Sequence, residues 1–131
     1  MRITGLDITL ITIPFAKREK WAWGVREGMT SAVVEVHTDA GVTGIGEAIV
    51  VLGPTPPIVV ELLRRMEELV AGEDPGRIEY LTAKVMGEGA WHSFRNTANT
   101  AWAAVEMACF DIVGKSKGLS LVELMGGVVR D

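Results

Sequence analysis

Apolar residues repeat with two different periods along this chain, and the change comes near residue 50. Before it, apolar and polar residues alternate, as at Leu6, Ile8 and Leu10, which is the period of a half-buried β-strand. After it, apolar residues recur every three or four positions, which is the period of an amphipathic helix. Strands followed by helices indicate an α+β fold with the helices packed on one face of a sheet.

Three strands are predicted, over residues 3–13, 30–38 and 42–49. Pro14 is expected to end the first strand, and Asp39-Ala40-Gly41 is typical of a tight turn between the second and third. A three-stranded antiparallel meander follows from this order. Residues 15–29 show no apolar period and are predicted to form a loop.

Three main helices are predicted beyond residue 50. The first begins at Pro56, after a possible cap at Thr55, and the second is shorter and contains residues 78–85. The third is the longest, and its apolar stripe over residues 98–112 is rich in alanines that permit close approach of a sheet or another helix. Ser120 and Glu123 have the spacing of a capping box, which predicts a last helix of about one turn.

Glycines at positions 41, 44 and 46 need a separate interpretation. A dinucleotide-binding loop has the order G-x-G-x-x-G and opens a helix, whereas the order here is G-x-x-G-x-G within a predicted strand. Gly44 and Gly46 face the same side of that strand. The favoured interpretation is therefore that they let another backbone come close to it.

Composition excludes several classes of protein. With 131 residues, 48% of them hydrophobic, the chain can bury a core and is not of the disordered class. A net charge of −4 without a stripe of basic residues argues against a nucleic-acid partner. No apolar run approaches the ~20 residues of a membrane helix, and no signal peptide is evident, so a cytoplasmic protein is expected. Cys109 is the single cysteine and is expected to be a buried, unreactive thiol.

The sequence offers no group of residues with the spacing of a catalytic or metal site. Its carboxylates are not placed to converge on Mg²⁺, and His37 and His92 lie too far apart for a zinc site. Trp21, Trp23 and Arg26 stand out in the predicted loop because tryptophans in a charged loop would leave apolar surface in water. Two interpretations stay open: these side chains fold onto the domain's own core, or they close over a neighbouring site.

Two segments together carry a family resemblance. Residues 38–47 read T-D-x-G-x-x-G-x-G-E, and residues 99–127 contain Asp111-Ile112, Gly114-Lys115 and a closing Gly126-Gly127. The whole chain resembles the N-terminal capping domain of the enolase superfamily, in its mandelate racemase/muconate lactonizing enzyme branch. Phe110 and Ser120 depart from that family's frequent Trp and Pro, and neither change argues against the fold.

The resemblance implies a parent enzyme in which a (β/α)8 barrel follows the capping domain and holds the metal ligands and the acid/base residues. In such an enzyme a carboxylate substrate binds Mg²⁺, a base removes the α-proton, and the metal stabilises the enediolate. The reaction class would be that of an isomerase or a lyase: a racemase, an acid-sugar dehydratase or a cycloisomerase. Lys115 and Lys117 have the spacing of that family's catalytic lysine pair, but they occupy the linker after the long helix, where they complement its dipole.

The same resemblance implies that residues 15–29 and 50–57 form lids over the barrel mouth and shape substrate specificity. The substrate-binding candidates are Trp21, Trp23, Arg26, Val50 and Leu52. No catalytic residue, metal ligand or cofactor is assigned to this chain itself, and Mg²⁺ is implied only for the parent enzyme.

We therefore expect a capping domain over residues 1–115, and a linker with a short helix over residues 116–131 that leads toward a barrel. The expected partners are such a barrel, in cis or in trans, a small carboxylate substrate, and further copies of the chain, because an exposed barrel-facing surface promotes association. Without the barrel, we expect no catalysis by these residues alone. A stand-alone α+β interaction or oligomerisation module is the alternative.

Overall fold

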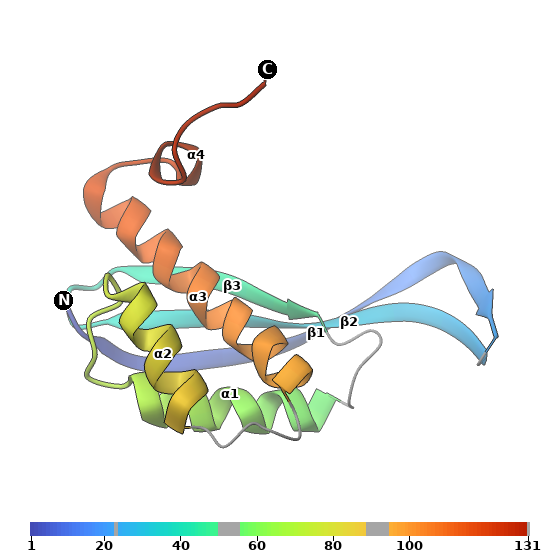
Figure 1. Cartoon of the computed structure of the whole chain (residues 1–131). Coiled ribbons are helices and arrows are strands. Elements are labelled where there is room, and N and C mark those ends of the chain that lie inside the picture. The colour runs from blue at the N-terminus through green and yellow to red at the C-terminus, as the bar shows by residue number, and fades with distance from the viewer. Residues whose placement is uncertain (23, 50–55, 89–94, 131) are drawn as a thin grey trace.

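The computed structural model describes residues 1–22, 24–49, 56–88 and 95–130. Three strands, β1 (Ile3–Trp21), β2 (Gly24–Thr38) and β3 (Thr43–Ile49), form one antiparallel sheet in the order β1-β2-β3 (Figure 1). The helices α1 (Pro56–Val70), α2 (Ile78–Glu88), α3 (Arg95–Lys117) and α4 (Leu121–Leu124) follow. The predicted α+β class, with a meander followed by helices and no barrel in the described residues, is confirmed.

The prediction of a loop over residues 15–29 is wrong. β1 and β2 continue as a long hairpin that projects away from the helices (Figure 1), with Glu19 opposite Arg26 and Trp21 opposite Gly24. No apolar alternation marks this hairpin because neither of its faces is buried under a helix. Nor does Pro14 end β1, which is an edge strand. The N–H of Leu6 points away from β2 and donates to Glu67, and Pro14, an even number of residues further along the strand, faces the same way. A proline at position 14 therefore removes no hydrogen bond between β1 and β2.

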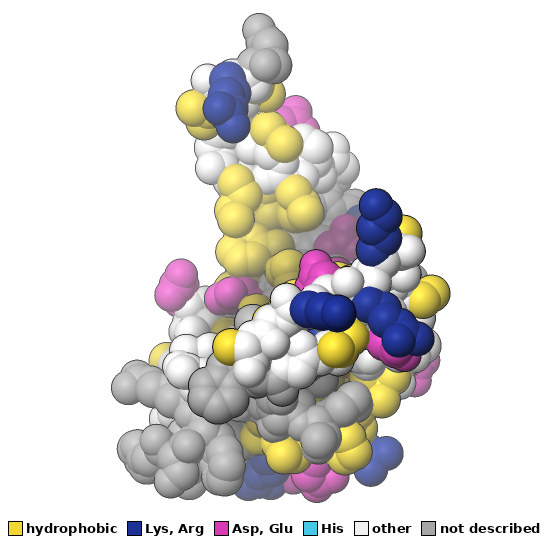
Figure 2. Space-filling view, turned by 90° about the vertical axis from the view of Figure 1, so that its right-hand side faces the viewer, with side chains coloured by type: hydrophobic (Ala, Val, Ile, Leu, Met, Phe, Trp, Pro, Cys, Tyr) yellow, Lys and Arg dark blue, Asp and Glu magenta, His cyan; other side chains and the backbone are white. Residues whose placement is uncertain are grey.

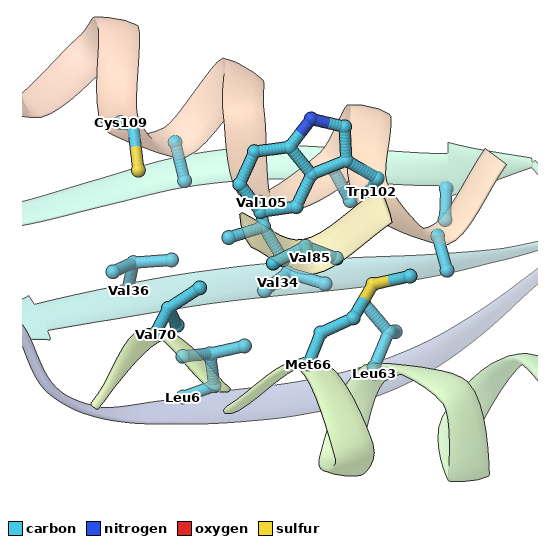
Figure 3. Packing of buried hydrophobic residues seen from close by; sticks show 14 of the residues in the cluster. Leu6, Val34, Val36, Leu63, Met66, Val70, Val85, Trp102, Val105 and Cys109 are labelled. Carbon is cyan, nitrogen blue, oxygen red and sulfur yellow. The ribbon is translucent and has the colours of Figure 1, made fainter. Parts of the chain in front are cut away.

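One face of the sheet meets the helices and forms the core. The alternating residues Ala32, Val34 and Val36 of β2 are fully buried, and they lie against apolar side chains from all three main helices. Figure 3 shows this packing, in which Leu63, Met66 and Val70 of α1, Val85 of α2, and Trp102, Val105 and Cys109 of α3 converge on the sheet. Burial of this cluster is the main favourable contribution to folding.

The closest contact between a helix and the sheet is that of α3 on β3. A Cβ atom placed on Gly44 would lie 2.0 Å from the carbonyl oxygen of Ala108, and one placed on Gly46 would lie 1.9 Å from that of Ala104. Such distances leave no room for any side chain, so the helix backbone rests directly on the strand. The predicted role of Gly44 and Gly46 is therefore confirmed, and the alanines of α3 are the other half of the same contact.

A partly buried ion pair joins the segment after α1 to α2. Lys84 Nζ donates to Glu73 Oε1 at 2.8 Å, and the carbonyl oxygen of Glu73 accepts a hydrogen bond from the N–H of Ile3 at the start of β1. The hydrogen bond from Lys84 lowers the pKa of Glu73 and raises the pKa of Lys84, against the opposing effect of burial. The pair thus ties β1, α1 and α2 together at one end of the sheet.

The last helix, α4, extends away from this body (Figure 1). The predicted capping box is present: the Ser120 hydroxyl accepts from the Glu123 N–H, and the Glu123 carboxylate accepts from the Ser120 N–H. The Ser120 N–H and the Ser120 hydroxyl both donate to the Glu123 carboxylate, and these hydrogen bonds lower the pKa of Glu123. None of the residues of α4 is buried, so it is held by its cap and by the chain rather than by a core.

We expect Gly46→Ala to lower the free energy of unfolding by about 3 kcal/mol or more, because α3 must move off β3 to admit the methyl group. Urea unfolding followed by tryptophan fluorescence measures the loss. Gly87→Ala is the matched control, since a Cβ there meets nothing within 4 Å; it should leave stability unchanged or raise it by up to about 1 kcal/mol. Equal effects of the two substitutions would contradict the proposed contact.

A second expectation concerns pH and the Glu73–Lys84 pair. Because folding lowers the pKa of Glu73, the stability that its ionised form contributes is present above its unfolded-state pKa of about 4.3. That stability is lost as pH falls through its lower folded-state pKa. Because folding raises the pKa of Lys84, the stability that its charged form contributes is present below its unfolded-state pKa of about 10.4. That stability is lost as pH rises through its higher folded-state pKa. The stability difference between the protein and Lys84→Met should be constant between about pH 5 and 10 and shrink outside that range.

Urea titrations at several pH values measure this difference. Arg64→Met is the control, because Arg64 faces Glu61 at 4.0 Å on the exposed side of α1. A Lys84→Met difference that persists undiminished at pH 2 would show that the pair does not act through its charges.

Candidate functional site

The end of the β1–β2 hairpin brings together two of the residues predicted to bind substrate. Arg26 lies opposite Glu19 across the hairpin, and Arg26 Nη2 is 2.7 Å from Glu19 Oε2. The guanidinium carbon of Arg26 lies 5.1 Å from the centroid of the Trp21 ring, which is within the range of a cation–π contact. Trp21 keeps 45% of its surface exposed. This group, Glu19, Trp21 and Arg26, is called the hairpin cluster below.

Two contacts hold the Arg26 side chain, but not all of its N–H donors have a partner. Its Nη2 is paired with Glu19 and its plane is placed by Trp21, while its buried Nε has no hydrogen-bond partner among the described residues. Ordered guanidinium groups of this kind suit recognition of planar anions such as carboxylates. The arrangement favours binding chemistry, since the cluster contains no serine, cysteine, lysine or histidine and its one carboxylate, Glu19, is paired with Arg26.

Both acidic residues of the hairpin end are paired, and its basic residues are in excess. Arg18 Nε lies 3.0 Å from Glu27 Oε1, and Glu19 is engaged by Arg26. Lys17 and Lys20 are exposed and form no ion pair with the described residues. The hairpin end therefore carries positive charge on a chain whose net charge is −4.

Trp23, Val50 and Leu52 lie outside the described residues. The structure thus brings together Trp21 and Arg26. Glu19, which positions Arg26, was not predicted; its opposite charge and its place in a charged segment were the only signals available in the sequence.

The edge of the sheet at β3 is closed by two residues of α3. Asp111 Oδ2 accepts a hydrogen bond from the backbone N–H of Ile45 at 2.9 Å, and Lys115 Nζ donates to the carbonyl oxygen of Thr43 at 2.8 Å. Lys115 Nζ also lies 2.7 Å from Asp111 Oδ2. Lys115 therefore binds the strand edge, a role that the sequence interpretation, which gave it only the helix dipole, missed.

Other reactive groups do not form a further site in the described part of the chain. Burial raises the pKa of the Cys109 thiol to about 12, so it stays protonated at neutral pH, as a structural cysteine does. Among the described residues, no group of three or more His, Cys, Asp or Glu side chains is placed to hold a metal ion. None of the helices that the structure describes is both long and apolar enough to cross a membrane.

The C-terminal segment carries exposed apolar side chains. Leu121, Val122 and Met125 expose 47%, 49% and 68% of their surfaces, and Val128 exposes 70%. Figure 2 shows apolar side chains on α4 and continuing from it toward the body of the domain. This group, Leu121, Val122, Met125 and Val128, is called the α4 surface below.

Known proteins with the same architecture are full enzymes of greater length. The hydrophobic dipeptide epimerase of Enterococcus faecalis is 28% identical over 130 residues, which cover 97% of this chain and 35% of the relative. The D-mannonate dehydratase of Novosphingobium aromaticivorans is 36% identical over 104 residues, covering 79% of this chain and 25% of the relative. The chain thus spans about a quarter to a third of the length of these relatives.

Solved structures agree with the sequence comparisons. The crystal structure of the dipeptide epimerase from Enterococcus faecalis, complexed with Mg and the dipeptide L-Leu-L-Tyr, matches with a TM-score of 0.85 at 28% identity, over 97% of this chain and 35% of that one. The family model of the mandelate racemase / muconate lactonizing enzyme N-terminal domain matches residues 8–126. The chain therefore belongs to the mandelate racemase/muconate lactonizing enzyme family of the enolase superfamily, as its N-terminal domain.

Proposed function

We propose that this chain is the substrate-specificity capping domain of a Mg²⁺-dependent enzyme that abstracts the α-proton of a carboxylate substrate. The observation that carries the proposal is the hairpin cluster, an ordered Arg–Trp pair on a hairpin that projects beyond the body of the domain. An epimerase, a racemase, dehydratases and a cycloisomerase are among the relatives, and each of these names denotes an isomerase or a lyase.

The hairpin supports a lid function through its shape and its side chains. A two-stranded hairpin without a covering helix gains little from burial, so it is free to pack against another surface. Trp21 supplies apolar surface that excludes water, and the guanidinium of Arg26 supplies directed donors for an anionic group. Glu19 and Trp21 hold Arg26 in place before any substrate arrives, which lowers the entropic cost of binding.

The α4 surface supports docking on a barrel. Helix α4 buries none of its own residues, yet its cap is complete, so its fold is set while its apolar side chains remain uncovered. An exposed apolar group of this kind is typical of an interaction surface. We place the barrel of the enzyme, in cis or in trans, against it, with residues 116–131 as the linker.

The tasks of the proposed enzyme divide between the barrel and this chain. The described residues do not fit a Mg²⁺ site, so the metal ligands and the α-proton base belong to the barrel. Bound there, Mg²⁺ would stabilise the negative charge that develops on the substrate carboxylate. This chain binds the part of the substrate that lies away from the metal, orients it and excludes water.

The proposal predicts that the purified chain catalyses no exchange of α-protons with D2O, with or without Mg²⁺, for dipeptides or acid sugars. A chimera that joins this chain to the barrel of the Enterococcus faecalis relative should catalyse exchange. In the chimera, Trp21→Ala and Arg26→Ala should each raise KM by about tenfold, because an ordered donor or its aromatic support is lost. Proton NMR measures all of these rates.

The Arg77–Tyr80 pair is the matched control, since Arg77, one residue before α2, stacks on the ring of Tyr80 in α2 at 3.9 Å, away from the hairpin. Tyr80→Ala should leave KM unchanged. Circular dichroism of each variant reports folding independently of activity. Exchange by the isolated chain, or equal KM values for the folded Trp21→Ala, Arg26→Ala and Tyr80→Ala chimeras, would contradict the proposal.

A further inference from the structure

The end of the β1–β2 hairpin concentrates positive charge. Residues 15–28 contain four basic and two acidic side chains, a net charge of +2, whereas the rest of the chain has nine basic and fifteen acidic ones. The four basic residues are Lys17, Arg18, Lys20 and Arg26. Because the hairpin projects away from the helices (Figure 1), the acidic excess of the body does not neutralise this end locally. The hairpin end therefore attracts anions.

Arg26 has more hydrogen-bond donors than the chain uses. A guanidinium carries five N–H donors, and the described residues accept a hydrogen bond only from Nη2, which donates to Glu19 Oε2 at 2.7 Å. The Nε atom is buried without a partner, while 27% of the side chain as a whole stays exposed. A charged donor that is withdrawn from water without an acceptor costs free energy. A further acceptor on this guanidinium would therefore be stabilising.

The contact with Glu19 shows which kind of anion fits. One oxygen of its carboxylate already lies at hydrogen-bond distance from a guanidinium whose position the Trp21 ring helps to fix. The pair joins one oxygen to one nitrogen, and 53% of the Glu19 side chain is exposed, so it is a weak ion pair. A carboxylate that accepts from two N–H groups of a guanidinium makes a stronger and more directed contact. The donors that Glu19 leaves open therefore suit a second, external carboxylate.

We propose that the hairpin cluster binds a carboxylate at the end of the substrate that lies away from the metal, so that the parent enzyme acts on dicarboxylates. This inference rests on the proposed capping function. One carboxylate of the substrate would bind Mg²⁺ in the barrel, and the other would accept hydrogen bonds from Arg26 while Trp21 contacts the apolar atoms beside it. The excess of basic residues on the hairpin end offsets the repulsion between the bound carboxylate and Glu19.

The same arrangement discriminates against substrates whose far end is neutral or cationic. When the hairpin closes over the barrel, the guanidinium of Arg26 loses water. A neutral amide compensates for this loss with a weaker hydrogen bond than a carboxylate makes, and an ammonium group is repelled. At a partly exposed site such as this one, we expect a carboxylate to bind about tenfold more tightly than its isosteric amide.

Binding of a carboxylate can be measured on this chain by itself. Propionate and propionamide have nearly the same shape and differ in charge, and each is titrated to about 100 mM at constant ionic strength. In nitrogen–proton NMR spectra, propionate should shift the Nε–H signal of Arg26 and the indole N–H signal of Trp21, with a Kd on the order of 10 mM. Propionamide should shift neither signal.

Arg77 is the matched control for this titration, because its guanidinium also lies over an aromatic ring, that of Tyr80, away from the hairpin. Its Nε–H signal should not move. No shift of the Arg26 signal with propionate would overturn the inference. So would shifts of equal size with propionamide, or at Arg77.

Substrate preference is tested in the chimera with the barrel of the Enterococcus faecalis relative. Two isosteric pairs of dipeptides are compared, L-Leu-L-Glu with L-Leu-L-Gln and L-Glu-L-Leu with L-Gln-L-Leu, so that the extra carboxylate stands in either position. In at least one pair, the Glu peptide should have a KM for α-proton exchange about tenfold below that of the Gln peptide. Arg26→Gln should remove this preference, and Arg77→Gln should retain it.

The outcomes separate this inference from the capping function on which it rests. A chimera that exchanges α-protons without preferring either Glu peptide, or whose preference survives Arg26→Gln, would overturn the inference and leave the capping function intact. A chimera without exchange would contradict the capping function, and the propionate titration would then decide whether the hairpin cluster binds a carboxylate. Circular dichroism confirms that each variant is folded.

Discussion

The direct contact between the backbones of α3 and β3 determines the arrangement of the other elements. At Gly44 and Gly46 the strand offers no side chain, and at Ala104 and Ala108 the helix offers only a methyl group, so the two backbones meet. This close approach places the larger apolar residues of α3, such as Trp102, Val105 and Cys109, over the middle of the sheet. There they meet α1 and α2, and the core closes.

The same contact explains the role of the segment that contains Asp111-Ile112 and Gly114-Lys115. With α3 lying on β3, Asp111 and Lys115 reach the outer edge of the strand and bind the N–H of Ile45 and the carbonyl oxygen of Thr43. An edge strand with unpaired backbone groups invites pairing with other chains, and these two side chains block part of that edge. Asp111 and Lys115 thus serve the fold, and the substrate binding that we propose lies at the opposite end of the sheet, on the hairpin.

Sequence patterns predicted those parts of the structure in which burial imposes a period. The meander, the three main helices, the close approach at Gly44 and Gly46, and the Ser120–Glu123 cap all depend on such local or periodic signals. The hairpin end was missed because neither of its faces is buried under a helix, so its sequence shows no apolar alternation. A proline on an edge strand also looks the same in sequence as a proline that ends a strand. The hydrogen bond of Lys115 to Thr43 and the ion pair of Glu19 with Arg26 were missed because they depend on how the elements come together in the folded structure.

The chain divides into a body held by the α3–β3 contact and a hairpin that, in the function we propose, completes its packing on a partner. Amide hydrogen exchange by NMR tests this division most directly. We expect the N–H of Ile45 and those of the α3 residues around Ala104 and Ala108 to exchange only through global unfolding. The paired N–H groups of the hairpin beyond Pro14 should exchange much faster, through local opening. Fast exchange at Ile45, or equal protection of the hairpin and the body, would contradict it.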